Sequence, residues 1–297
     1  MTDSRAAVDP LTGLLATLDL TDTGARTDED IFTGPSQWMP GGRVFGGQVY
    51  AQSIMAAIRT VDADRSIHST HGYFLRPGDA NQPITFSVDR IHDGRSFSTR
   101  RTQAYQNGLP ILSMIASFQD DDPGLEHQLD MPEGITPPEE LPPAAEVLGP
   151  VDHPVAQFWA TNRAFDMRHV EQPIYLGPDP NPSPRQALWM RTIGPMPDDD
   201  NLHRAALAYA SDYSILEPVL RNHGLEWTHR GLKMASLDHA MWWHRPARVD
   251  EWLLYVQESP NAIGGRGLSL GRIYTRDGVL VASVAQEGMV RVPELLG

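Results

Sequence analysis

The chain has 297 residues, of which 40% are hydrophobic and 21% charged, as in ordinary globular proteins. It carries no cysteine, which excludes disulfides, thiolate metal sites and a cysteine nucleophile, and its net charge of −14 argues against nucleic acid as a partner. No apolar run reaches the ~18 residues of a membrane span. The first residues lack a signal-peptide pattern, and the last four are not a peroxisomal address. We therefore expect a cytoplasmic protein without stable membrane insertion.

The first predicted helix spans 48–58 and follows the pair Gly46-Gly47. Its apolar residues recur at helical spacing. A helix N-terminus presents free N–H groups, and glycine lets a ligand carbonyl or phosphate approach closely. Gly46 and Gly47 are therefore either substrate contacts or a tight entry turn. Four predicted strands follow, at 69–75, 84–91, 95–106 and 110–118.

An acidic, proline-rich segment at 120–150 separates the first half from the second. It holds nine acidic residues and seven prolines but no lysine or arginine, so we expect a surface linker outside the core. The predicted organisation is an N-terminal repeat at 1–119, this linker, and a C-terminal repeat at 151–297 that carries the catalytic residues. A second loop is expected at 177–200, inside the second half.

The second half repeats the pattern of the first. A helix is predicted at 202–217, ended by Pro218, and the strands that follow are predicted at 233–243, 251–258, 266–275 and 279–286. A long helix beside an antiparallel sheet, made twice, is an α+β fold.

Two landmarks keep the same spacing in both halves, which indicates an internal duplication. Arg76-Pro77 and Arg245-Pro246 are 169 residues apart, and the turn pairs Asn107-Gly108 and Asp277-Gly278 are 170 apart. Each turn pair has the sequence of a two-residue hairpin loop between strands.

Asp212 is the most informative single residue. In the predicted helix its neighbours one turn away are Ala208, Tyr209, Ile215 and Leu216, and none is a charged partner. A carboxylate on the buried side of a helix is costly unless it is hydrogen-bonded, so Asp212 is either a structural acid or a functional one.

Two further polar residues lie on apolar strand faces. Gln286 shares a face with Leu280, Ala282 and Val284, and Ser236 shares one with Met234 and Trp242. Each is either a satisfied core group or a catalytic one. Asp238 is predicted to share the face of Ser236 and is a rival acid to Asp212.

The duplication favours the catalytic interpretation of these polar residues over the structural one. The first-half counterparts of Asp212, Ser236 and Gln286 are Ser53, Ile67 and Ala116. A purely structural network is expected to persist in both copies. We therefore predict one active centre per chain, built on the second half.

Other motif matches lack the context that their chemistry needs. The sequence 267–271 fits G-x-S-x-G, but it lies inside a predicted strand rather than at a strand-to-helix turn. His239 and His244 lack a helical zinc-binding spacing, so no metal is predicted.

The chain resembles acyl-CoA thioesterase II, a family of tandem hotdog-fold enzymes. The matching runs extend in order over most of the chain: Phe45-Gly46-Gly47-Gln48, Tyr73-Phe74-Leu75-Arg76-Pro77-Gly78-Asp79, Asp93-Gly94-Arg95-Ser96-Phe97, Ser211-Asp212-Tyr213, Leu237-Asp238-His239-Ala240-Met241-Trp242 and Val284-Ala285-Gln286-Glu287-Gly288.

The resemblance implies a double hotdog, with each repeat a sheet wrapped around a long helix. It also implies that Asp212, Ser236 and Gln286 hold a water that hydrolyses fatty acyl-CoA of medium to long chain, with no cofactor. The family more often has threonine where this chain has Ser236. An amide at the helix N-terminus, with Gly47 as candidate, would polarise the thioester carbonyl, and Arg266 is a candidate contact for the CoA phosphates. A role in fatty acid and lipid metabolism, and a homo-oligomer (dimer or tetramer), are further expectations.

Two alternatives stay open at the level of sequence. One is a non-catalytic acyl-CoA or lipid-binding protein. The other is an enoyl-CoA hydratase-type lyase, which needs an Asp–His pair; Glu217, not a histidine, stands five residues after Asp212.

Overall fold

The structure, a computed structural model, describes residues 9–25 and 27–293. Both chain ends lie outside these residues. The expectations about a signal peptide and a peroxisomal address concern those ends.

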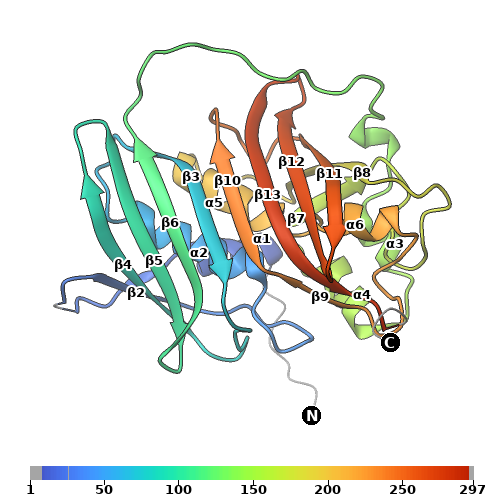
Figure 1. Cartoon of the computed structure of the whole chain (residues 1–297), viewed down its shortest axis with the longest axis horizontal. Helices are drawn as coiled ribbons and strands as arrows, with labels where there is room; N and C mark the ends of the chain where they lie inside the picture. The colour runs from blue at the N-terminus through green and yellow to red at the C-terminus, as the bar shows by residue number, and fades with distance from the viewer. Residues whose placement is uncertain (1–8, 26, 294–297) are drawn as a thin grey trace.

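One antiparallel sheet forms the front layer of the molecule (Figure 1). Its strand order is β1-β2-β4-β5-β6-β3-β10-β13-β12-β11-β8-β7, and β9 also pairs with β13. The strands are β1 (Thr21–Asp22), β2 (Asp30–Gly34), β3 (Ser66–Phe74), β4 (Ile84–Asp93), β5 (Phe97–Gln106), β6 (Leu109–Gln119), β7 (Phe165–His169), β8 (Arg185–Thr192), β9 (Lys233–Ser236), β10 (Asp238–Trp243), β11 (Leu253–Ile263), β12 (Arg266–Thr275) and β13 (Leu280–Arg291).

The two long central helices, α2 and α5, lie behind the sheet (Figure 1). The core fills the space between them and the inner face of the sheet, where Ile54 of α2 and Leu207 of α5 are almost completely buried. The helices are α1 (Pro10–Leu18), α2 (Gly46–Ile58), α3 (Ala144–Leu148), α4 (Pro154–Thr161), α5 (Asp200–Ser211) and α6 (Glu217–Asn222), with a short 3-10 helix η1 (Pro138–Glu140).

The strand order confirms the predicted duplication and the α+β class. Inside the edge strands β1 and β7, the first half runs β2-β4-β5-β6-β3 toward the centre, and the second half runs β8-β11-β12-β13-β10. The halves therefore meet at the β3–β10 pair, where Thr70 lies opposite Met241. This places α2 and α5 side by side beneath the middle of the sheet.

The two turn pairs of the duplication differ in form. Asn107 and Gly108 both have positive φ, of 51° and 74°, as a two-residue type I′ hairpin requires. At Asp277-Gly278 the loop between β12 and β13 is longer, spanning 276–279, and in that loop only Gly278 has positive φ. The prediction of a two-residue loop is correct for the first pair and wrong for the second.

Both proline-rich segments hold more structure than predicted. Residues 121–137 form neither helix nor strand and run along the upper edge of the molecule in Figure 1. Beyond them, however, Ala144 and Leu148 of α3 are 3% and 4% exposed and belong to the core, so the prediction that the whole of 120–150 avoids the core is wrong. The predicted loop 177–200 contains strand β8, whose inner residues are buried between its neighbours. In the described part of the chain, no helix is long and apolar enough to cross a membrane.

Candidate active site

Asp212 stands at the end of a helix rather than inside one, which corrects the prediction of a helix at 202–217. Helix α5 ends at Ser211, and the Asp212 amide donates to the Ala210 carbonyl as the helix closes. Pro218 lies in the first turn of α6, so it helps to start that helix rather than to end α5. The side chain of Asp212 is thereby free to turn toward the sheet.

The structure brings the three predicted residues together. Gln286 Nε2 donates to Asp212 Oδ1 at 3.0 Å, and the Ser236 hydroxyl donates to the same oxygen at 3.3 Å. Gln286 Nε2 also donates to Ser236 Oγ at 2.8 Å. The other carboxylate oxygen, Oδ2, accepts from the Gly47 amide at 2.7 Å. One half of the chain therefore supplies the triad, and the other supplies a backbone donor.

A β-bulge sets which side chains face this site. Ser236 pairs with Gly288, and Ala240 pairs with Ala285, so the strand made of β9 and β10 holds one residue more than its partner β13 over this stretch. The bulge turns Ser236 and His239 to the same inner side. Asp238 leaves that side and accepts from the Glu287 amide at 2.7 Å. The prediction that Ser236 and Asp238 share a face is wrong, and Asp238 does not line the cavity next to Asp212.

His239 belongs to the site and escaped the sequence prediction. It is 1% exposed. Its Nδ1 contacts Gln286 Oε1, and its Nε2 lies 3.0 Å from Ser211 Oγ. Because the Gln286 amide nitrogen already donates to Asp212 and Ser236, its oxygen is an acceptor and the proton of that contact lies on His239 Nδ1. The sequence signal was present: His239 shares the buried face of β10 with Met241 and Trp243.

Burial dominates the electrostatics of the site. It raises the pKa of the Asp212 carboxyl above its ordinary value, against the His239 ring and the hydrogen bonds from Gln286, Gly47 and Ser236, which favour the charged form. Burial lowers the pKa of His239, against the attraction of the Asp212 carboxylate. The arrangement is a desolvated carboxylate that is held by three donors and is ready to accept a proton.

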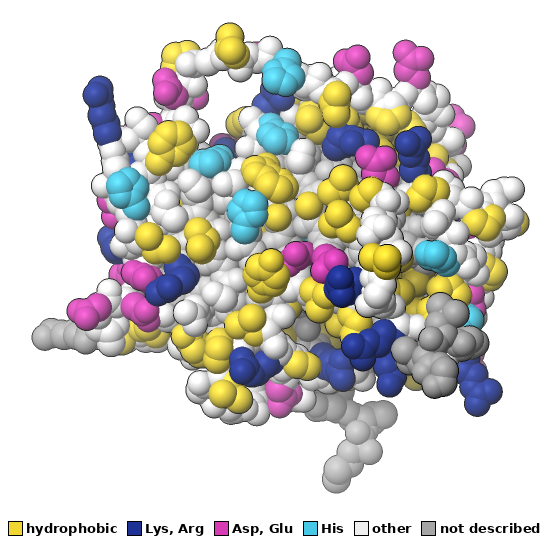
Figure 2. Space-filling view, viewed as in Figure 1, with side chains coloured by type: hydrophobic (Ala, Val, Ile, Leu, Met, Phe, Trp, Pro, Cys, Tyr) yellow, Lys and Arg dark blue, Asp and Glu magenta, His cyan; other side chains and the backbone are white. Residues whose placement is uncertain are grey.

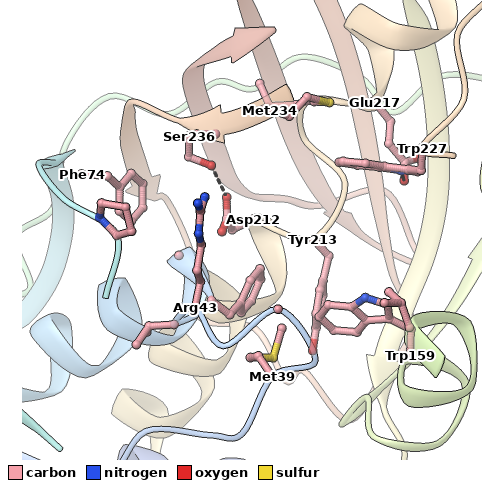
Figure 3. A pocket seen from close by; sticks show the side chains of 18 of the residues that line it. Met39, Arg43, Phe74, Trp159, Asp212, Tyr213, Glu217, Trp227, Met234 and Ser236 are labelled. Carbon is pink, nitrogen blue, oxygen red and sulfur yellow. Dashed lines mark hydrogen bonds between the residues drawn. The ribbon is translucent and has the colours of Figure 1, made fainter. Parts of the chain in front are cut away.

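A cavity of about 1110 Å³ opens beside this carboxylate, above the ~300–1,000 Å³ of typical small-molecule sites. Asp212, Ser236 and Gln286 lie on its wall, and the rest of the lining is mainly apolar and aromatic. Figure 3 shows the side chains around it, with Arg43 extending toward Asp212 and Ser236. The apolar and aromatic lining residues labelled there are Met39, Phe74, Trp159, Tyr213, Trp227 and Met234.

Both glycines of the pair Gly46-Gly47 are required by close approach. A Cβ on Gly46 would lie 2.7 Å from Asp212 Oδ2, and one on Gly47 would lie 2.3 Å from the Tyr209 carbonyl oxygen. Gly46 lines the cavity, whereas the Gly47 amide is already bonded to Asp212. Both interpretations of the pair, a site contact and a tight turn, therefore have a structural basis.

Arg266 is not brought to the cavity. Its Nε contacts Glu287 at 3.1 Å on strands β12 and β13, and it is absent from the cavity lining. The arginines that do line the cavity are Arg43, Arg76 and Arg163. The G-x-S-x-G match at 267–271 lies within strand β12, which confirms its interpretation as part of a strand.

Two helix-and-sheet repeats joined edge to edge, with one polar triad on the second, define a double hotdog protein. A hot dog fold protein from Alicyclobacillus acidocaldarius shares this architecture, with a TM-score of 0.76 at 17% identity, over 95% of this chain and 98% of that one. An acyl-CoA thioesterase II, TesB2, from Mycobacterium marinum gives a TM-score of 0.78 at 43% identity and covers 94% of this chain and 98% of its own.

The sequence comparisons give the family. Residues 34–119 match the family described as acyl-CoA thioesterase N-terminal domain, and residues 178–289 match the family described as acyl-CoA thioesterase. The human acyl-coenzyme A thioesterase 8 is 40% identical over 276 residues, which cover 89% of this chain and 86% of that protein. The chain belongs to the acyl-CoA thioesterase II family.

Proposed function

We propose that this protein hydrolyses acyl-CoA thioesters to a fatty acid and CoA, by direct attack of a water held by Asp212, Ser236 and Gln286. The observation that carries the proposal is the buried Asp212 carboxylate, which is held by Ser236 and Gln286 on the wall of an apolar cavity. Family membership supports the same reaction.

Asp212 would act as the general base. It takes a proton from the water as the water oxygen bonds to the thioester carbonyl carbon, and it returns the proton to the sulfur as the carbon–sulfur bond breaks. Ser236 and Gln286 would orient the water and the carboxylate. The raised pKa of Asp212 strengthens it as a base, while the three donors favour its charged form.

The N-terminus of α2 would stabilise the negative charge that develops on the carbonyl oxygen. Because Asp212 occupies the Gly47 amide, we assign this role to the Gly46 amide at the cavity wall. The apolar cavity would take a medium- to long-chain acyl group. Arg43 and Arg76 are both exposed at the cavity, so we propose them, in place of Arg266, as contacts for the CoA phosphates.

The test is release of CoA from a ladder of acyl-CoA esters, followed with a thiol reagent. The chain has no cysteine, so it adds no background signal. We expect Asp212→Asn to lose at least ~100-fold in kcat, the lower range for a lost general base. Asp238→Asn is the matched control, since Asp238 lies outside the cavity, and it should keep its rate.

Each alternative gives a different result. Tight acyl-CoA binding without CoA release would identify a binding protein, and hydration of an enoyl-CoA would identify a lyase. The lyase is disfavoured because Glu217, five residues after Asp212, is no histidine and accepts from the Trp227 indole at 2.9 Å. The histidine of the site, His239, contacts Gln286 and Ser211 with its two ring nitrogens and does not line the cavity.

We also propose a homo-oligomer, a dimer or tetramer, that acts in fatty acid and lipid metabolism in the cytoplasm. Figure 2 shows hydrophobic and histidine side chains gathered over the middle strands of the outer sheet face. Tyr73 on β3 and Ile115 on β6 are 62% and 48% exposed. Light scattering in solution gives the oligomeric state.

A further inference from the structure

Arg163 is a cationic side chain in the wall of a cavity whose lining is mainly apolar and aromatic. It lies between α4 and β7 and lines the same cavity as Asp212. Its Nη1 donates a hydrogen bond to the Tyr175 hydroxyl, at 3.2 Å. Its buried Nε has no partner in the part of the chain that the structure describes, and no described carboxylate lies within 4.0 Å of the guanidinium.

Three aromatic rings hold the guanidinium in place. Its central carbon lies 4.8 Å from the Trp159 ring centroid, 5.3 Å from that of Tyr213 and 5.6 Å from that of Tyr175. Cation–π contacts attract the charge, but they leave the N–H donors of a guanidinium unused. Arg163 is partly buried, and its Nε is withdrawn from water without a partner in the described part of the chain. Leaving a charged donor unsatisfied in this way is costly, and an anionic ligand would satisfy it.

The acidic group that shares this wall is already engaged. Glu217 also lines the cavity, and it is 1% exposed. Its Oε1 accepts from the Trp227 indole and its Oε2 from the Gln186 amide, each at 2.9 Å. Glu217 therefore attracts Arg163 from beyond contact distance and leaves the guanidinium N–H groups open to a ligand.

Arg163 is also close to the proposed reaction centre. Tyr213, whose ring lies against the guanidinium, is the residue next to Asp212. Tyr213 and Asp212 line the cavity together with Ser236. A ligand whose thioester sits at Asp212 and whose chain enters the apolar part of the cavity therefore passes near Arg163.

We propose that Arg163 is a subsite for an oxyanion of the ligand, and specifically for a carboxylate on the acyl chain, so that the enzyme accepts acyl-CoA esters bearing a second acidic group. This inference rests on the proposed hydrolysis. The same chemistry would also recognise a CoA phosphate. We favour the acyl carboxylate because Arg163 is enclosed by aromatic rings, whereas Arg43 and Arg76 are exposed to the solvent from which a polyphosphate would arrive.

The experiment compares CoA esters of dicarboxylic acids with methyl-ended acyl-CoA esters of equal chain length, over a ladder of lengths. We expect Arg163→Met to lower kcat/KM for the carboxylate-ended series by at least ~10-fold while the methyl-ended series holds or improves, as for a lost charge-assisted pair. Arg163→Lys should retain part of the selectivity. Arg266→Met removes an arginine outside the cavity and should change neither series.

Pantetheine thioesters, which lack the CoA phosphates, show whether Arg163 binds the acyl carboxylate or a CoA phosphate. A selective loss in Arg163→Met that persists with pantetheine supports the acyl carboxylate. A loss that is equal for both series and disappears with pantetheine assigns Arg163 to the phosphates and overturns the proposal. So does a wild-type enzyme that disfavours carboxylate-ended esters by more than ~10-fold at every length, a result that requires no variant to fold.

A binding measurement separates this inference from the hydrolase proposal. Calorimetry on Asp212→Asn, with and without Arg163→Met, measures affinity for a carboxylate-ended and a methyl-ended acyl-CoA without turnover. Weaker binding of the carboxylate-ended ester alone supports the subsite even if no ester is hydrolysed. Equal affinities in both proteins overturn it.

Discussion

At the scale of single residues, the site is a compromise between burial and hydrogen bonding around one carboxylate. Burial raises the pKa of Asp212 and so favours its protonated form, whereas the donors Gly47, Ser236 and Gln286 favour the charged form. A base with a raised pKa is active only in its deprotonated form, so activity is lost as the pH falls through that pKa.

The wild-type acidic limb of kcat/KM against pH should therefore have its midpoint above the ~3.9 of an unperturbed aspartate. Gln286 donates to the charged carboxylate and so lowers its pKa. Gln286→Ala should move the limb to higher pH, besides slowing the reaction. Gln103→Ala, on strand β5, should leave the limb in place. An unmoved limb in Gln286→Ala would contradict the assignment of Asp212 as the base stabilised by Gln286.

His239 is a positioning residue, because it contacts Gln286 and does not line the cavity. Its Nδ1 holds the Gln286 oxygen, and this fixes the amide nitrogen toward Asp212 and Ser236. We expect His239→Ala to lower kcat by about 10- to 100-fold, as for a small misplacement of a positioned group, with little change in KM.

His239→Asn keeps a donor near the position of Nδ1 and should recover part of the rate. His244→Ala, on the exposed histidine that contacts Ser283 Oγ, is the control and should behave as wild type. Equal rates in His239→Ala and wild type would show that Gln286 needs no second partner.

At the scale of elements, the sequence was sufficient wherever a segment is long and periodic. Helix α2 and strands β3–β6 and β11–β13 lie close to their predicted positions. The sequence was insufficient where tertiary contacts determine where an element ends or which way a side chain faces. The end of α5 at Ser211 and the bulge between β9 and β10 both depend on partners far along the chain, such as the Gly47 amide and the Glu287 backbone. For this reason Asp238 was placed on the wrong face and His239 was missed. The structure does bring the three predicted residues, Asp212, Ser236 and Gln286, into hydrogen-bonding contact.

The close approach of α2 to α5 depends on the glycine at position 47. A Cβ on Gly47 would meet the Tyr209 carbonyl at 2.3 Å, and backbone cannot move aside as a flexible side chain can. Gly47→Ala should lower the free energy of unfolding by about 1–3 kcal/mol, as overpacking does. Gly13→Ala, in α1 with open space around it, should be neutral or stabilising by up to ~1 kcal/mol. Denaturant unfolding of both variants measures the difference, and equal losses would exclude the helix–helix clash as the cause.

At the scale of the whole molecule, the site belongs to both halves of the duplication. The second half supplies Asp212, Ser236 and Gln286, and the first supplies the Gly47 amide and part of the cavity wall. The counterparts Ile67 and Ala116 carry no polar side chain. Under the proposed function, one copy thus supplies the reacting side chains, and the other copy completes the wall of the cavity.

This arrangement predicts what happens when the connection between the halves is cut. A protease site placed between Gly124 and Leu125 lies in an exposed stretch without helix or strand. The β3–β10 pairing, the Arg204 hydrogen bond to the Ile67 carbonyl at 2.6 Å and the Gly47–Asp212 contact all join the halves elsewhere. After cleavage the two fragments should co-elute in gel filtration and keep a rate within about twofold of the uncut protein, because a connecting loop contributes little beyond closure entropy.

Fragments that separate, or that stay together without activity, would contradict the division into repeats at 1–119 and 151–297 joined by a linker at 120–150. The segment after Pro137 packs into the core through α3. A cut moved to that segment, beside Leu148, should therefore cost stability, whereas the cut at Gly124 should not. The contrast between the two cuts separates the part of the predicted linker that only connects the halves from the part that belongs to the fold.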